Sequence, residues 1–396
     1  MRIAFLLPDP GIPVGGTKGA SVHVAEVCRA LIDLGSSVTL LAQRVAGPLP
    51  DGVDIVHLDP GPIPRGAAGE LSRMRACADF ADRAAPQLAR LHPDLVYERL
   101  SLFFDAGAAL ARHAGSVRLV EVNAPVAAER ERHFGLVQRE AADRAERIAI
   151  AGAQVIAVSE PVAAWVRERG PAGVDVVGNG VDNARFDPDA RRGDALAVRR
   201  NLGLDDAELV GFMGSLKPWH GVDVLLDAAE RLALHRPSLR VLVVGDGPCR
   251  AALETKASTP GLAGRVIFTG GIDPRSVPSH LVALDVATAP FLPSDDFYFS
   301  PLKVVEAMAA GRPVVASRFG PIEAMLAGNG VIVPAGDAHA LAGAISRLLD
   351  DRVAAASLGS AARRHAVLTH GWDGVARRIL ESAERSRINQ STVVIR

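Results

Sequence analysis

The 396-residue sequence contains little cysteine, few aromatic residues and almost no net charge. Cys28, Cys77 and Cys249 are far apart and lack paired spacing, which excludes a disulfide framework or a cysteine-based metal cluster. We therefore expect small apolar cysteines in a protein of the reducing cytoplasm. The 44 basic and 45 acidic residues give a formal charge of −1, which argues against a nucleic-acid surface and favours a small-molecule partner.

Long hydrophobic runs are also missing. No window reaches the roughly 18 uninterrupted apolar residues of a membrane span. The apolar run at residues 1–8 ends in a proline and is too short for a signal peptide, so we interpret it as the first strand. The alanine- and arginine-rich segments 67–92 and 125–150 leave peripheral contact with the inner face of a membrane open, although solvated helix faces are the simpler interpretation.

Short apolar runs alternate with helical patterns along the chain, which predicts an α/β fold with doubly wound parallel sheets. A glycine-, aspartate- and arginine-rich stretch at 179–205 is interpreted as the connection between a first domain, 1–178, and a second domain, 206–371. Helices are expected at 337–350, 351–369 and 372–387, with an irregular tail after Ser386. The expected strands are 3–7, 38–41, 55–58, 95–97, 119–122, 155–158, 174–177, 209–213, 240–244, 266–268, 286–289, 314–316 and 330–333.

One predicted helix places a lysine where helix electrostatics disfavour it. Ser300 followed by Pro301 predicts an N-cap and a first helical residue, so Lys303 falls in the first turn. The positive end of the helix dipole destabilises a cation there unless an anion, such as phosphate, binds in front of it. Glu306 lies on the same helix face and suits the hydroxyls of a ribose. The alternative is a solvated ion pair between Lys303 and Glu306.

Three loops that follow predicted strands and open helices are candidates for phosphate binding. Residues 8–20 include Gly15, Gly16 and Lys18; a simple chain reversal is the alternative there. Residues 214–221 include Lys217 and His220.

The same second loop contains Trp219, for which packing is the favoured role. The third loop, residues 244–248, contains Gly245 and Pro248, and we expect it to be mainly structural.

Over nearly its whole length, in the order and spacing of several short segments, the chain resembles the retaining, nucleotide-sugar-dependent glycosyltransferases of family 4. That resemblance implies a GT-B fold of two Rossmann-like domains facing a central cleft. It also implies acceptor binding by the first domain, donor binding by the second, and a C-terminal helix, about 372–390, that returns to the first domain. The matching segments are 15–16, 158–160, 179–182, 214–221, 244–248, 268–270, 306–315 and 333–337.

By this resemblance Glu306 binds the ribose of the donor and Gly16 lies against its diphosphate. No cofactor and no protein-bound metal are implied. The remaining residues of the implied donor site are Gly15, Ser215, His220, Gly245, Tyr298, Phe299, Ser300, Pro301 and Leu302.

The sequence departs from the family pattern at its charged positions. Ser215 and His220 stand where the family usually has an arginine and a lysine, so we expect Lys217 and Lys303 to compensate the diphosphate charge. Tyr298 stands where many members have a glutamate, although a subgroup with a Ser-Pro-Leu-Lys segment also lacks it.

Two acids precede Tyr298. Asp295 and Asp296 could substitute for the missing glutamate or be ordinary loop acids.

The implied reaction is transfer with retention at the anomeric carbon, in which the leaving phosphate accepts the acceptor's proton. The protein then stabilises charge and positions the acceptor without supplying a nucleophile. Asn123 stands where many members have a histidine, and it can hydrogen-bond a hydroxyl but cannot act as a base.

Further acceptor-facing candidates are Lys18, Glu98 and Arg99, with a structural ion pair as an equal alternative for the last two. We expect His23, His133 and His280 at the surface or at helix caps.

Several alternatives stay open at this point. A non-catalytic sugar-nucleotide binder or an auxiliary transferase subunit fits the same motifs. An epimerase is disfavoured because no acid–base set is assembled, and a dehydrogenase because no Gly-x-Gly-x-x-Gly turn follows the first strand. UDP is favoured over GDP by family habit only. The acceptor, a glycan, a lipid-linked sugar or a small natural product, and the oligomeric state do not follow from the sequence.

Overall fold

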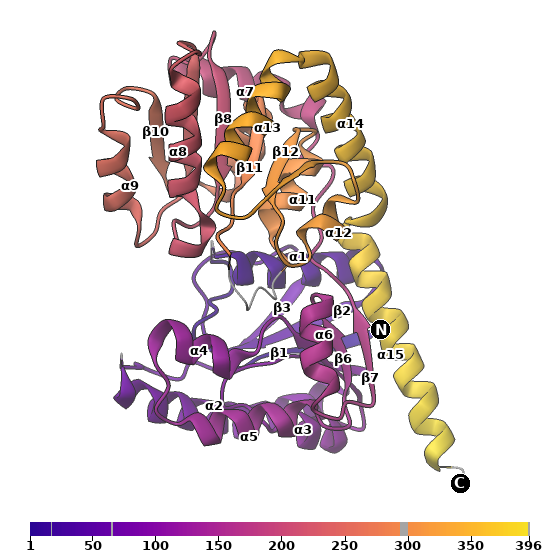
Figure 1. Ribbon diagram of the computed structural model, residues 1–396. Coiled ribbons are helices and arrows are strands. Elements are labelled where there is room, and N and C mark those ends of the chain that lie inside the picture. Colours follow the sequence, from indigo (N-terminus) through magenta and orange to yellow (C-terminus); the bar gives the residue numbers. More distant parts are fainter. Residues whose placement is uncertain (17, 65, 294–299, 395–396) are drawn as a thin grey trace. The chain divides into compact units, whose positions relative to one another are not determined.

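The computed structural model describes residues 1–16, 18–64, 66–293 and 300–394. Contacts divide the chain into two units, Met1–Asn179 with Trp372–Arg396, and Gly180–Gly371. Each unit is an α/β structure in which helices cover a parallel sheet (Figure 1). The predicted α/β fold class is therefore confirmed.

Unit 1 contains a seven-stranded sheet of order β3-β2-β1-β4-β5-β6-β7, parallel throughout. The order reverses between β1 and β4, and ligands of such sheets bind at the carboxyl edge near this switch point. Strand bounds are β1 Arg2–Leu7, β2 Ser37–Ala42, β3 Val53–His57, β4 Leu95–Arg99, β5 Val117–Val122, β6 Gln154–Ala157 and β7 Gly173–Val176. Helix bounds are α1 Gly19–Asp33, α2 Ala67–Leu91, α3 Gly107–Ala114, α4 Val126–Phe134, α5 Arg139–Ile150, α6 Glu160–Arg167 and α15 Trp372–Val394.

Unit 2 contains a six-stranded parallel sheet of order β10-β9-β8-β11-β12-β13, which is the Rossmann order with its switch point between β8 and β11. Strand bounds are β8 Glu208–Met213, β9 Leu239–Val244, β10 Val266–Gly270, β11 Val286–Ala289, β12 Val314–Ser317 and β13 Val331–Val333. Helix bounds are α7 Pro188–Asn201, α8 Val222–Ala233, α9 Arg250–Ala257, α10 Val277–Val282, α11 Leu302–Ala309, α12 Ile322–Leu326, α13 Ala338–Asp350 and α14 Arg352–Thr369, with 3-10 turns η1 Pro218–His220 and η2 Pro274–Ser276.

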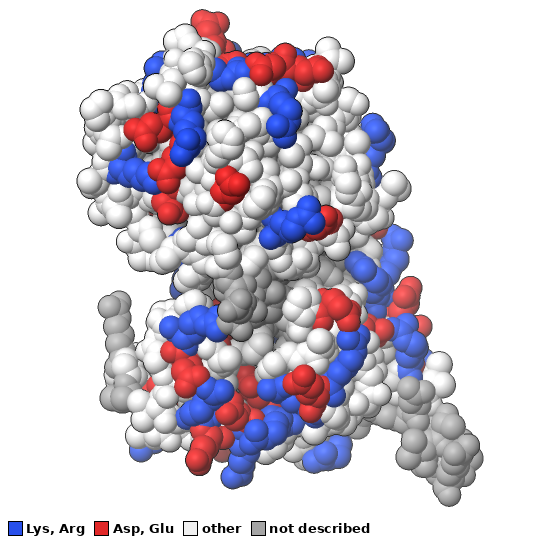
Figure 2. All heavy atoms as spheres, in the orientation of Figure 1, with Lys and Arg blue, Asp and Glu red and all other residues white. Residues whose placement is uncertain are grey.

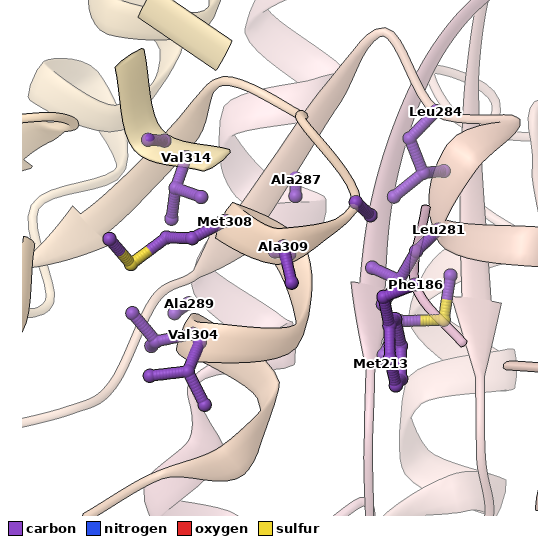
Figure 3. Packing of buried hydrophobic residues seen from close by; sticks show 14 of the residues in the cluster. Phe186, Met213, Leu281, Leu284, Ala287, Ala289, Val304, Met308, Ala309 and Val314 are labelled. Atoms are coloured by element: carbon purple, nitrogen blue, oxygen red, sulfur yellow. The ribbon is translucent and has the colours of Figure 1, made fainter. Parts of the chain in front are cut away.

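The core of unit 2 holds α11 in place. Val304, Met308 and Ala309 are fully buried and belong to the same apolar cluster as Ala289 of β11 and Val314 of β12 (Figure 3). Val305 is buried in the same cluster, three residues before Met308 and four before Ala309, so these residues form one apolar stripe on the helix. This packing fixes the rotation of α11 and therefore the direction in which its first turn points.

Two regions differ from their sequence-based descriptions. α15 continues to Val394, so the expected irregular tail after Ser386 is wrong; helix hydrogen bonds are local and need no apolar periodicity. Residues 180–205 are more than a connection, since they include α7, which packs against α10 within unit 2. The expected return of the C-terminal helix is confirmed, because α15 packs against α1.

The segments considered for membrane contact are helical. Segment 67–92 forms α2, and segment 125–150 forms α4 and α5. None of the helices built from described residues is both long and apolar enough to span a bilayer. On the face drawn in Figure 2, basic and acidic side chains are interspersed over the surface.

Candidate active site

The start of α11 differs from the sequence-based interpretation by one residue. Pro301 is the N-cap, with extended backbone angles, and the helix begins at Leu302. The expectation that Ser300 caps the helix is wrong: its side chain is buried, with Oγ 3.9 Å from the Met325 sulfur. The Pro301 carbonyl accepts the first turn's bond from the Val304 N–H. Lys303 nevertheless lies in the first turn, as predicted.

Lys303 buries its ammonium group among aromatic rings. Nζ lies 4.1 Å from the ring centroid of Phe212 and 5.1 Å from that of Phe291. It has no hydrogen-bond partner among the described residues. A Cβ atom placed on Gly214 would lie 3.0 Å from Nζ, so the ammonium group lies beside the backbone of the β8–α8 loop. The alternative of a solvated ion pair is therefore wrong.

This environment disfavours the charged form of Lys303. Burial lowers its pKa to about 7; Glu306 opposes the shift and Lys217 adds to it. Contact with two ring faces compensates only part of the lost hydration of an ammonium ion. An anion bound at this position would supply the missing counter-charge.

The β8–α8 loop is held by close backbone contacts. Gly214 N donates to the Val244 carbonyl at 2.9 Å, and a Cβ on Gly245 would lie 1.9 Å from the Gly214 oxygen. Gly221 has φ +65°, and a Cβ there would lie 1.8 Å from the Pro290 oxygen. The loops after β8, β9 and β11 are therefore locked together at the carboxyl edge of unit 2, with glycine required at both contacts.

The side chains of this loop have separate environments. Ser215 and Lys217 are exposed, and Lys217 Nζ lies 4.8 Å from the ring centroid of Trp219. His220 is buried and its Nδ1 donates to the Ser215 carbonyl at 2.5 Å. Burial lowers the pKa of His220 to about 3, with contributions from Lys303 and Lys217, so the imidazole is neutral. The hydrogen bond from His220 to the Ser215 carbonyl holds the loop closed, whereas the exposed side chain of Lys217 can reach a ligand.

Glu306 is half-buried one turn after Lys303, close enough for its charge to act on that lysine. Leu302 is also half-buried in this first turn. Tyr298, Phe299, Asp295 and Asp296 lie outside the described residues.

The glycine-rich loop of unit 1 runs beside the chain that leaves β2. Val14 forms a parallel bridge with Val45, and Gly15 has φ +72°. A Cβ on Gly15 would lie 2.4 Å from the Gly47 oxygen, so glycine is required. Gly16 is half-buried, and Lys18 is the exposed N-cap of α1.

A buried polar cluster lies at the carboxyl ends of β4 and β5 in unit 1. Nε2 of His23 lies 2.5 Å from Oε1 of Glu121, and Arg99 Nη1 donates to the same oxygen at 2.9 Å. Asn123 Nδ2 also donates to it. The expectation of a surface or capping His23 is therefore wrong: it is buried, and its Nδ1 lies 2.7 Å from Oδ1 of Asn179.

Glu98 and Arg99 do not pair with each other. Glu98 is fully buried and accepts from Arg118 Nε at 2.8 Å, beneath Gly107, whose Cβ would lie 1.7 Å from the carboxylate. Burial raises the pKa of Glu98, with Arg118 opposing the shift. We therefore assign Glu98 a structural role. Arg99 instead belongs to the cluster around Glu121.

Sequence reasoning did not single out Glu121, Arg118 or the burial of His23. A signal was present, because Arg118 and Glu121 interrupt an otherwise apolar buried strand. Charged residues at such positions require partners. Elsewhere, no group of three His, Cys, Asp or Glu side chains within the described ranges is arranged to hold a metal ion.

Solved structures share this fold. Anabaena HepE in complex with UDP-glucose is 22% identical, covers 97% of this chain and 100% of its own, and superimposes with a TM-score of 0.75. Sucrose-phosphate synthase of Thermosynechococcus elongatus is 23% identical, with coverages of 97% and 98% and a TM-score of 0.75. The fold is therefore GT-B, as the resemblance implied.

Sequence comparisons identify the family. The family described as Glycosyltransferase Family 4 matches residues 17–185, and Glycosyl transferases group 1 matches residues 207–351. The D-inositol 3-phosphate glycosyltransferase of Salinispora tropica is 31% identical over 95% of this chain and 82% of its own length. The GDP-mannose-dependent alpha-(1-6)-phosphatidylinositol monomannoside mannosyltransferase of Mycolicibacterium smegmatis is 35% identical over 51% of this chain and 54% of its own. The chain belongs to the family-4, group 1 glycosyltransferases, and the predicted enzyme class is confirmed.

Proposed function

We propose that the chain transfers a sugar from a nucleoside diphosphate sugar to an acceptor hydroxyl, with retention of anomeric configuration. The observation that carries this proposal is the buried ammonium of Lys303. It lies in the first turn of α11 at the carboxyl edge of unit 2, with no hydrogen-bond partner among the described residues. A diphosphate is the kind of anion that this position stabilises.

The diphosphate and the ribose of the donor have proposed partners in unit 2. Lys303 and the exposed Lys217 would face the diphosphate, together with the backbone of the loop at Gly214. Glu306 would bind the ribose hydroxyls. HepE is described in complex with UDP and UDP-glucose, and the mycobacterial relative is named as GDP-mannose-dependent. We favour UDP as the nucleotide.

In the proposed reaction the bond between the anomeric carbon and the diphosphate breaks. The acceptor oxygen bonds to the same face of that carbon, and its hydrogen passes to the departing phosphate oxygen. The protein therefore supplies charge stabilisation and positioning without a nucleophile or a bound metal. We propose that Asn123, at the carboxyl edge of unit 1, binds the acceptor hydroxyl. Because several relatives are named D-inositol 3-phosphate glycosyltransferase, a phosphorylated cyclitol is the first acceptor to test.

Thermal unfolding with UDP, GDP and ADP tests donor binding. We expect UDP to raise the melting temperature most, since a ligand that binds only the folded chain stabilises it by mass action. Turnover is then measured as UDP release from UDP-glucose with D-inositol 3-phosphate and a glycan panel. Binding without turnover would indicate a non-catalytic sugar-nucleotide binder, and no stabilisation by any of the three nucleotides would refute the donor site.

Donor affinity should depend on pH through Lys303. Its pKa of about 7 in the free chain means that the amine is charged below this pH and increasingly neutral above it. A bound diphosphate favours the ammonium form, so binding above about pH 7 must take up a proton, and affinity should fall by up to about tenfold per pH unit. Below about pH 7 affinity should be nearly constant.

Calorimetry with UDP-glucose from about pH 6 to about pH 9, in buffers of different ionisation enthalpy, measures this uptake. UDP-glucose is the suitable probe because it lacks the terminal phosphate of UDP, which titrates near pH 6. Affinity that does not change with pH would contradict the assignment of Lys303 to the diphosphate.

A further inference from the structure

Glu121 has an unusual set of partners for a carboxylate in a buried strand. Its Oε1 atom accepts hydrogen bonds from Arg99 Nη1 and Asn123 Nδ2, and His23 Nε2 lies 2.5 Å from the same oxygen as an ion-pair partner. The residue is almost completely buried at the carboxyl end of β5. Two hydrogen bonds and an ion pair on one oxygen imply that this carboxylate organises the groups around it.

These three partners come from elements that meet at one edge of the sheet. His23 lies on α1, which follows β1; Arg99 ends β4; and Asn123 follows β5. β1 and β4 are neighbours at the switch point of unit 1, and β5 is next to β4. The carboxyl edge at a switch point is where open α/β sheets bind ligands, so the cluster lies at the expected ligand position of this unit.

The charge on Glu121 determines which way the Asn123 amide points. Although burial opposes ionisation, the charges of His23 and Arg99 lower the pKa of Glu121 to about 2. An ionised carboxylate only accepts hydrogen bonds, so the amide must turn Nδ2 toward Glu121 and Oδ1 away from it. None of the described residues donates a hydrogen bond to Oδ1, and Asn123 is half-buried rather than enclosed.

We propose that Glu121 is a positioning residue that presents Asn123 Oδ1 to the acceptor, where it accepts the hydrogen bond of the reacting hydroxyl. This inference rests on the proposed glycosyl transfer and adds how its acceptor is recognised. A carboxamide oxygen orients the hydroxyl without removing its proton, which remains available to the leaving phosphate. His23 and Arg99 act through Glu121 by keeping it ionised.

The first test makes the same change, glutamate to glutamine, at two positions. In Glu121→Gln the side chain can donate as well as accept, so the orientation of Asn123 is no longer enforced. Glu70→Gln is the matched control, since Glu70 is another buried glutamate of unit 1 and binds backbone N–H groups of Val137 and Gln138. The probes are UDP-glucose with D-inositol 3-phosphate as acceptor, and UDP-glucose with water alone.

We expect Glu121→Gln to lower the rate of sugar transfer roughly tenfold or more, through a higher KM for the acceptor. The rate of hydrolysis by water alone should fall by a similar factor. The Kd of UDP should stay within about twofold, because the nucleotide is assigned to unit 2. Glu70→Gln should keep the native rate. Equal rates for the two variants would overturn the inference, whereas failure of the native chain to bind UDP would instead refute the proposed function.

A double variant separates positioning from folding. Glu121→Gln combined with Asn123→Asp exchanges carboxylate and amide, so an oxygen again faces the acceptor and Arg99 keeps a counter-charge. We expect it to recover a substantial part of the rate that Glu121→Gln loses; no recovery would contradict the inference.

A third readout needs no turnover. In nitrogen-15 NMR, the Asn123 amide protons, assigned by their loss in Asn123→Ala, should shift strongly downfield in the native chain and lose that shift in Glu121→Gln. An unshifted native signal would show that the amide is not held by Glu121. If Glu121→Gln does not fold, Asn123→Ala alone decides, and a native rate in that variant would overturn the inference.

Discussion

Replacing Lys303 with methionine is expected to stabilise unit 2 and to weaken UDP binding roughly tenfold or more. The ammonium is buried between Phe212 and Phe291 without a hydrogen-bond partner among the described residues, so in the free chain it opposes folding. Methionine fills similar space and removes the charge. In the complex that same charge would face the diphosphate, so the variant loses affinity while it gains stability.

The stability gain should depend on pH in a defined direction. The pKa of Lys303 is lowered to about 7 in the folded chain, against about 10.4 unfolded, so the penalty is complete below about pH 7 and disappears as pH rises toward 10. We expect the melting temperature of Lys303→Met to exceed that of the native chain by roughly 4–10 °C near pH 6 and by less near pH 9.

Calorimetry with UDP and thermal unfolding across pH measure the two effects of Lys303→Met. Lys217→Met is the control, because Lys217 is exposed and its removal should weaken binding without raising the melting temperature. A variant at position 303 that is less stable than the native chain and still binds UDP normally would show that Lys303 serves packing alone.

Gly245→Ala is expected to lower the stability of unit 2 strongly. Gly245 has φ +134°, and its new Cβ would lie 1.9 Å from the Gly214 oxygen. Backbone on both sides must move, which costs about 3 kcal/mol or more. For a unit of this size the melting temperature should fall by roughly 6–12 °C. Because the displaced loop also borders Lys303, UDP affinity should fall as well.

Gly271→Ala is the matched control in the same unit. Its Cβ would have no neighbour within 4 Å and its φ is not positive, so the change should stay within about 0.5 kcal/mol. Thermal unfolding with and without UDP measures both variants. If Gly245→Ala were as stable as Gly271→Ala, the close contact between the loops after β8 and β9 would be refuted.

The sheets were predictable because their signal is local. Each buried parallel strand is a short apolar run between helical patterns, and β11 lies at residues 286–289 as expected. The first-turn position of Lys303 followed from the same kind of signal, a helix start marked by proline. The cap itself was misplaced by one residue, since the Pro301 backbone stays extended.

The environments of the charged residues were not predictable. Their adjacency in the sequence suggests an ion pair between Glu98 and Arg99, but successive residues of a strand point to opposite faces. Each therefore pairs with a residue of the neighbouring strand β5, Glu98 with Arg118 and Arg99 with Glu121. The sequence predicts a surface position for His23 because the partners that bury it, Glu121 and Asn179, are about a hundred residues or more away in the chain.

The sequence by itself determined the two parallel sheets, the glycine-rich loops and the family, because periodicity and motif spacing are properties of neighbouring residues. Only the tertiary structure decided that the Lys303 ammonium is buried between two rings, that His220 is a neutral loop contact, and that Asn123 donates to the buried Glu121. The physical reason is that charge and hydrogen-bonding depend on burial and on partners, and packing brings both from distant parts of the chain.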